Sequence, residues 1–94
     1  MMLRYDQTAD ALYITLREGV AIARTEQLDP GTLVDVDRVG GAVGVEVIRP
    51  ARSWPLDDLV EQFDVPAGDA EVLRSLWSVG QPYPFAKQEL VEVV

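Results

Sequence analysis

The strongest constraint on the fold is a change in the spacing of apolar residues at Arg49-Pro50. Before this point apolar and polar residues alternate, which is the two-residue period of a strand with one buried face. The clearest case is the segment from Ala9 to Leu16, whose buried face we expect to carry Leu12, Ile14 and Leu16. After this point apolar residues recur at the spacing of an amphipathic helix: Leu56, Leu59, Val60 and Phe63. The sequence therefore predicts strands followed by helices.

Turn-forming residues divide the first half into short strands. Leu3 to Tyr5 is a short extended start, and the polar residues 6–8 favour a corner, because their side chains bond to nearby backbone. A third strand is predicted from Val20 to Thr25, with Val20, Ile22 and Arg24 on one face. The run from Gln27 to Gly31 contains Asp-Pro-Gly and predicts the turn that follows this strand.

The pair Gly40-Gly41 predicts a hairpin between strands at Leu33–Asp37 and Ala42–Ile48. Two-residue hairpin loops need positive φ, which glycine adopts without strain. With this loop Asp35 would lie directly opposite Glu46. Five valines would share the buried face: Val34, Val36, Val43, Val45 and Val47.

Two helices are predicted in the second half. Ser53 is a candidate N-cap and Pro55 suits a first helical turn. A second helix is predicted from about Asp69 to Ser78, after a break at Pro66-Ala67-Gly68 and ending before Gly80. Its inward residues would be Ala70, Leu73, Leu76 and Trp77.

These elements predict an α+β fold in one domain, residues 1–94. Residues 1–50 would form an antiparallel β-meander of four to five strands, and residues 53–79 a helical hairpin that covers it. Residues 80–94 would form an extended arm, in which Gln88–Val94 alternates like a strand that could extend this sheet or another subunit's.

The charge of the chain excludes several classes of partner. Eight basic residues against sixteen acidic ones give a net charge of −8, which repels nucleic acid and anionic membrane surfaces. Most of the excess is C-terminal: six Arg and eight acids give −2 over residues 1–52, and Arg74, Lys87 and eight acids give −6 over residues 53–94. No signal or transit segment and no apolar run of spanning length is present, so we expect a cytoplasmic protein without a membrane contact.

The same charge weighs against a DNA-binding role for the helical pair. Its spacing resembles a helix-turn-helix, but residues 53–79 carry one Arg against six acids, whereas a DNA-reading helix presents basic residues to phosphates. A helical hairpin that covers the sheet is the favoured interpretation.

The acidic residues of the predicted hairpin form the first candidate site. Asp35, Asp37 and Glu46 would share the face opposite the valines, with Asp10 and Tyr13 on the strand beside them. Neighbouring carboxylates raise one another's pKa or recruit a cation, so this face is a candidate ligand or cation site. The alternative is a solvent-exposed sheet face whose acidic charge is neutralised by nearby arginines. We favour this alternative, because most antiparallel sheets expose one face to water.

A second polar cluster lies at the predicted corner, where Tyr5, Asp6, Asp10 and Tyr13 would serve acid-base chemistry or brace the turn. The brace is favoured, since carboxylates beside a turn accept backbone N–H bonds. The chain has no Cys and no His, so a triad or a zinc site of ordinary type has no base or ligands. We predict no catalytic residues, no metal and no cofactor.

Aromatic residues supply the candidate interface. On the predicted arm Tyr83 lies between two prolines and Phe85 follows the second of them, and Trp54 precedes the first helix. Aromatic side chains are the commonest anchors of protein interfaces.

Four segments resemble the domain-of-unknown-function family 2283: Tyr5-Asp6, Ala9-Asp10-Ala11-Leu12-Tyr13-Ile14, Val34-Asp35-Val36-Asp37 and Gly44-Val45-Glu46-Val47. The resemblance covers residues 1–50 and excludes the helical segment from Ser53 onward. Val45 and Val47 stand where isoleucine is common. The resemblance implies a meander fold in a small, mostly prokaryotic family without an assigned activity. Some relatives are thought to pair with toxin-like small proteins, which implies an antitoxin-like or regulatory role.

Two classes of function follow. The first is a non-catalytic protein-interaction module that forms a homo-oligomer, most simply a dimer, through a strand edge or the arm, and binds a basic protein partner. The second is a small-molecule or metal-binding domain, conceivably an enzyme, that uses the acidic sheet face.

Overall fold

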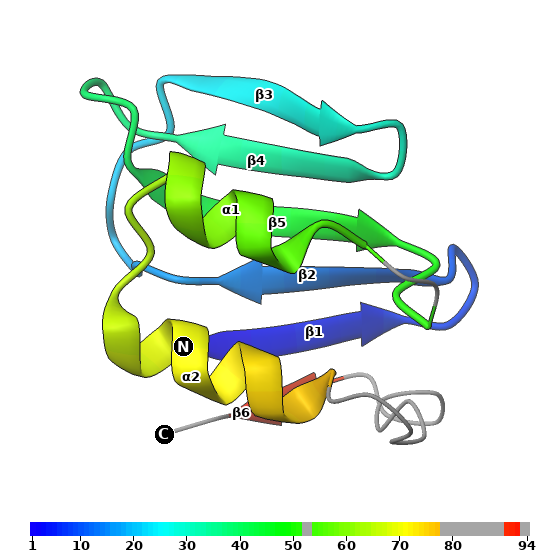
Figure 1. Cartoon of the computed structure of the whole chain (residues 1–94). Coiled ribbons are helices and arrows are strands. Elements are labelled where there is room, and N and C mark those ends of the chain that lie inside the picture. Colours follow the sequence, from blue (N-terminus) through cyan, green and yellow to red (C-terminus); the bar gives the residue numbers. More distant parts are fainter. Residues whose placement is uncertain (52–53, 78–89, 93–94) are drawn as a thin grey trace.

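The computed structural model describes residues 1–51, 54–77 and 90–92, the last three by their backbone only. Five strands come first, two helices follow, and a short strand closes the described chain (Figure 1). The elements are β1 (Met2–Asp6), β2 (Ala11–Thr15), β3 (Arg24–Asp29), β4 (Thr32–Val36), β5 (Ala42–Ile48), α1 (Leu56–Gln62), α2 (Ala67–Leu76) and β6 (Leu90–Glu92). The predicted α+β fold, an antiparallel sheet followed by a helical hairpin, is confirmed.

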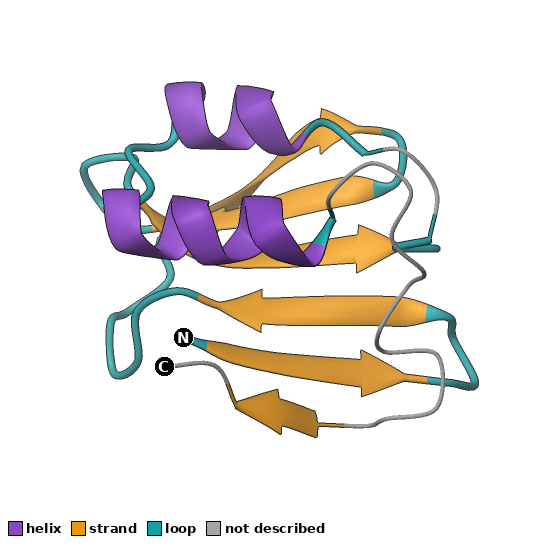
Figure 2. Ribbon diagram, turned by 60° about the horizontal axis from the view of Figure 1, so that its bottom comes forward, coloured by secondary structure: helices purple, strands orange, loops and turns teal. Residues whose placement is uncertain are grey.

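The strands form one antiparallel sheet in the order β3-β4-β5-β2-β1-β6. β3, β4 and β5 make a meander, whereas β2 pairs with β5, so residues 16–23 carry the chain past two strands to the far edge. Both α1 and α2 lie on the same face of this sheet, so no helix of the described residues covers its other face (Figure 2).

The core lies between the sheet and the helices. As predicted, Leu12 and Ile14 of β2 and Leu16 just after it are buried in the core, and the inward residues of β4 and β5 join them. Leu59 of α1 and Leu73 of α2 are completely buried against these strands. Burying one such side chain stabilises the fold by about 1.5 to 3 kcal/mol, which explains why short helices persist on this face.

The third strand is displaced from its predicted position. Val20 and Ile22 do not belong to a strand and are 36% and 52% exposed, and β3 begins only at Arg24. Its pairing is set by a tight loop at Pro30-Gly31, which brings Asp29 opposite Thr32. The polar residues predicted to form a turn are therefore the end of an edge strand. Apolar residues need not alternate along this strand, because one side of it is exposed.

The hairpin between β4 and β5 is longer than predicted. Val36 pairs with Ala42, so five residues connect the strands and Gly40-Gly41 is only the end of the loop. Asp37 sets this length, because its Oδ1 accepts hydrogen bonds from the backbone N–H groups of Val39 and Gly41, at 3.0 and 2.9 Å. The register between Asp35 and Val36 shifts by one residue. As a result Ala42, rather than Val43, joins the valines of the core.

Prolines mark the helix starts. α1 begins directly after Pro55, and the predicted N-cap, Ser53, lies outside the described residues. α2 begins at Ala67 rather than at Asp69, because the Pro66 carbonyl accepts the first helical bond, from Ala70 N–H at 2.9 Å. Ala70, Leu73, Leu76 and Trp77 all contact the core, as predicted.

The predicted arm is described only in part. β6 pairs antiparallel with β1, with Leu3 opposite Val91, so the end of the arm extends this sheet. Tyr83 and Phe85, like the predicted helix end at Gly80, lie outside the described residues.

Candidate functional site

The candidate acidic site falls on the sheet face that the helices leave uncovered, which we call the outer face. It is formed by the strand residues whose side chains alternate with the core residues, and Tyr13 of β2 lies near its centre. Arg4 of β1 and Glu46 of β5 are the direct neighbours of Tyr13. The predicted face for Asp35 and Glu46 is therefore correct.

A hydrogen-bond network crosses the outer face from β2 to β3. The Tyr13 hydroxyl donates to Asp35 Oδ2 at 2.6 Å, and the Thr25 hydroxyl donates to Asp35 Oδ1 at 2.5 Å. Tyr13 reaches β4 by lying across β5 at Gly44, where a Cβ atom would fall within 2.8 Å of ring carbon Cε2. Both oxygens of the Asp35 carboxylate thus accept hydrogen bonds, one from a β2 side chain and one from a β3 side chain.

The network holds Tyr13 in its protonated form. Partial burial raises the pKa of the Tyr13 hydroxyl far above its usual value of 10.0, and the hydrogen bond to Asp35 and the charges of Asp35 and Glu46 raise it further. Each of these causes disfavours the phenolate. At neutral pH Tyr13 is a hydrogen-bond donor and not a base.

Asp37 serves the β4–β5 loop. Arg17 Nη2 donates to Asp37 Oδ2 at 2.7 Å, and Arg17 Nε donates to the Ala42 carbonyl at 2.9 Å. The bond from Arg17, together with the backbone bonds from Gly41 and Val39, lowers the pKa of the Asp37 carboxyl below its usual 3.8. Asp37 is therefore an ionised loop brace.

Asp35 and Glu46 are not directly opposite each other, which corrects the predicted register. Asp35 pairs with Gly44 and Glu46 pairs with Leu33, because the loop contains five residues instead of two. In the described part of the chain, the Glu46 carboxylate has no hydrogen bond or ion pair, although it is half-buried. Over the same residues, no three acidic side chains lie close enough together to hold a metal ion.

The corner between β1 and β2 is braced by hydrogen bonds, as the favoured interpretation has it. Asp6 Oδ1 accepts from the N–H groups of Thr8 and Ala9 at 3.0 and 3.2 Å. The Tyr5 hydroxyl donates to Asp10 Oδ1 at 2.6 Å, and this bond, with burial and nearby charge, raises the pKa of Tyr5. Tyr13 does not join this corner, and Asp10 does not join the network of Tyr13.

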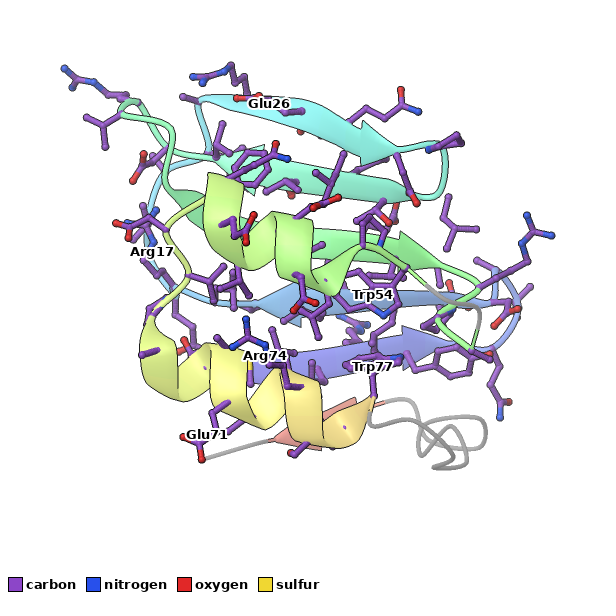
Figure 3. All side chains as sticks on the ribbon, in the orientation of Figure 1. Arg17, Glu26, Trp54, Glu71, Arg74 and Trp77 are labelled. Carbon is purple, nitrogen blue, oxygen red and sulfur yellow. The ribbon has the colours of Figure 1, made fainter. Side chains whose placement is uncertain are left out.

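Of the candidate interface aromatics, Trp54 is described and lies in the core. It is 8% exposed and packs edge to face against Trp77, with ring centroids 5.3 Å apart (Figure 3). Trp77 Nε1 donates to the Pro50 carbonyl at 2.8 Å, whereas Trp54 Nε1 has no partner among the described residues. The pair joins the segment after β5 to the end of α2.

Comparison with known proteins gives one match. The family described as "Protein of unknown function (DUF2283)" matches residues 2–49, about half of the chain. This chain belongs to the DUF2283 family. No curated protein and no solved structure matches it.

The DUF2283 match includes β1 to β5 and stops before α1. It therefore contains the whole outer face of those strands, with Tyr13, Gly44 and Asp35, and excludes the Trp54–Trp77 pair. No helix in the described segments is long and apolar enough to cross a membrane.

Three contributors to these contacts were not predicted as site residues: Thr25 and Gly44 of the outer face, and Arg17, which bonds Asp37. Gly44 carries a usable signal, because an isolated glycine inside a strand pattern often marks a close approach by another group. Thr25 and Arg17 carry none, since each depends on a pairing register that the loop lengths determine.

Proposed function

We propose that this DUF2283 protein is a non-catalytic protein-interaction module that associates with itself and binds a basic protein partner, in an antitoxin-like or regulatory role. The observation that carries the proposal is the outer face, a broad sheet surface that no described helix covers. It presents partly exposed apolar side chains, Leu33 and Ile48, beside Tyr13. A surface of mixed apolar and polar groups around a fixed aromatic residue is typical of protein interfaces.

The state of the polar groups supports a non-catalytic role. An acid-base catalyst works best with a pKa near the operating pH. Here the pKa of Tyr13 is raised away from neutrality and that of Asp37 is lowered away from it. Both shifts stabilise the form that makes structural hydrogen bonds, which suits a rigid surface better than proton transfer.

The charge of the helical layer supports a basic partner. Arg74 is the only basic residue between positions 54 and 77. Five acidic residues of this layer are exposed: Asp57, Asp58, Glu61, Asp64 and Glu71. Arg74 is itself close to Asp57, at 3.3 Å. Such a surface attracts a positively charged protein and accelerates the encounter at low salt.

Sedimentation velocity of the full chain over a range of concentrations tests self-association, and a thermal-shift screen with divalent cations and metabolites tests the competing class. We expect a concentration-dependent dimer and no stabilisation by these small ligands. A strict monomer that a cation or metabolite stabilises, with the effect removed by Asp35→Asn or Glu46→Gln, would instead establish a ligand-binding domain.

Co-expression with the protein encoded by the neighbouring gene tests the basic partner. We expect a basic product to co-purify, and its yield to fall with the variant Glu61→Lys/Glu71→Lys on the helical layer. Equal recovery with this variant would remove the helical layer from the interaction.

A further inference from the structure

Two opposite charges flank Tyr13 symmetrically on the outer face. In the sheet register Tyr13 pairs with Arg4 on one side and with Glu46 on the other. Strands are about 4.8 Å apart, so the two residues are equally distant from β2, in opposite directions. A basic and an acidic position thus lie in one row across the face, with β2 midway between them.

Neither charge has a partner within the described residues. Arg4 is exposed and Glu46 is half-buried, and neither makes a hydrogen bond or an ion pair there. A partly buried carboxylate without a partner costs free energy, which a cation placed above the sheet would recover. Asp35, by contrast, already accepts hydrogen bonds from Tyr13 and Thr25.

The surroundings of this row are flat and largely uncharged. The Tyr13 ring lies down over Gly44, so it does not stand out from the sheet. Partly exposed, uncharged residues continue the surface: Leu33 in the same row, and Met2, Ala11, Thr15 and Ile48 in the two neighbouring rows. The acids of these neighbouring rows are Asp6 and Asp35. A flat face of this kind suits another sheet packed about 10 Å above it.

We infer that a second copy of this chain docks on the outer face about a two-fold axis that runs parallel to β2, midway between the two sheets, with Arg4 of each copy paired to Glu46 of the other. Rotation about this axis carries β1 of one copy over β5 of its partner. Because Arg4 and Glu46 are equally far from β2, the rotation places Arg4 of each copy over Glu46 of the other, which gives two opposite-charge pairs. This row of the face is therefore complementary to itself, which suits an isologous dimer.

The β3 edge of the sheet is less suited to self-association. β3 carries an Arg24–Glu26 ion pair of 2.7 Å, and Pro30 follows it directly. Charged side chains and proline on an edge strand oppose the addition of another strand. This favours face-to-face packing over strand addition at β3.

The inference rests on the self-association proposed above and is tested by charge reversal in the full chain. Sedimentation velocity would compare wild type with Arg4→Glu, Glu46→Arg and the exchanged variant Arg4→Glu/Glu46→Arg. Each single reversal places like charges together twice, so we expect the dimer dissociation constant to rise by about tenfold or more. The exchanged variant should return to within about threefold of wild type, because it restores both opposite-charge pairs.

Two control variants make the same charge changes outside the face. Arg38→Glu lies in the β4–β5 loop and Glu61→Arg on α1, and both residues are exposed. Neither should change the dissociation constant. Circular dichroism would verify that every variant retains the native secondary structure.

Cross-linking gives a second, independent measurement. The chain has no Cys, so Thr15→Cys places a single thiol on β2, at the proposed axis. We expect a short bismaleimide to link two copies at this position and to leave Glu61→Cys unlinked.

The outcomes separate the two proposals. A wild-type monomer at every concentration would overturn both. A dimer that tolerates the single reversals and does not cross-link at position 15 would overturn this inference and leave self-association standing, through another surface. Weakened single variants without recovery in the exchanged variant would overturn the pairing of Arg4 with Glu46.

Discussion

The substitution Gly44→Ala is a direct test of the network on the outer face. Gly44 has no positive φ, so its backbone conformation is open to alanine. The obstacle is steric, since the added methyl would overlap the hydroxyl and ring of Tyr13. Tyr13 must then move away from β5 and release its hydrogen bond to Asp35.

The expected cost follows from these two effects. Forcing an extra carbon into a packed site costs about 1 to 3 kcal/mol. Losing a hydrogen bond to a charged group costs about 1.5 to 3 kcal/mol, and less for a partly exposed pair such as this one. We therefore expect Gly44→Ala to lower the free energy of unfolding by about 3 kcal/mol, or the melting temperature by roughly 12 to 24 °C.

Urea unfolding followed by tryptophan fluorescence measures this change, and a double-mutant cycle identifies its cause. In a Tyr13→Ala background the methyl has space, so Gly44→Ala should become neutral or slightly stabilising. Tyr13→Phe, which removes the hydroxyl alone, should cost about 1 to 2 kcal/mol. An equal cost of Gly44→Ala in both backgrounds would refute the steric explanation.

Three further predictions concern pH and packing. Because the pKa of Asp37 is lowered in the folded state, Asp37 contributes fully to stability above the usual carboxyl pKa, and this contribution is lost as pH falls through the folded pKa. In urea titrations, the stability advantage of wild type over Asp37→Asn should therefore disappear between about pH 5 and pH 2. The pKa of Tyr13 is raised, so its contribution is complete below pH 10.0 and declines above it; alkaline absorbance titration should show that Tyr13→Phe removes a phenol that ionises late. Leu59→Ala should cost about 2 to 5 kcal/mol by thermal unfolding, and Val60→Ala on the same helix clearly less, since Leu59 is fully buried and Val60 only partly.

Periodicity was sufficient to predict the parts of the fold that bury a continuous apolar face. The inward residues of β2 and the stripes of both helices were predicted correctly, because their spacing follows from the geometry of strands and helices. β3 was displaced because its residues, Arg24 to Asp29, are largely polar. An edge strand with an exposed side does not need alternating apolar residues, and strand prediction from periodicity depends on that alternation.

The candidate site was predictable as a face but not as a set of contacts. Alternation placed Asp35, Glu46 and Tyr13 together, whereas the partners of each depend on register. A five-residue loop braced by Asp37 moved Asp35 from Glu46 to Gly44, and only then does Tyr13 meet Asp35 across the glycine. The hydrogen bonds from two backbone N–H groups to one carboxylate thus fix which outer-face residues of β4 and β5 lie opposite each other.

The pairing of β2 with β5 also has a consequence for the order of folding. β3, β4 and β5 are joined by short loops and can associate locally, whereas Ile14 meets Val45 only after the intervening chain closes into a loop. Closure of that loop costs entropy before any contact offsets it, so we expect this step to limit the folding rate. Substitutions at the β2–β5 junction should accordingly slow refolding in stopped-flow experiments, and substitutions that weaken the edge strand should mainly accelerate unfolding.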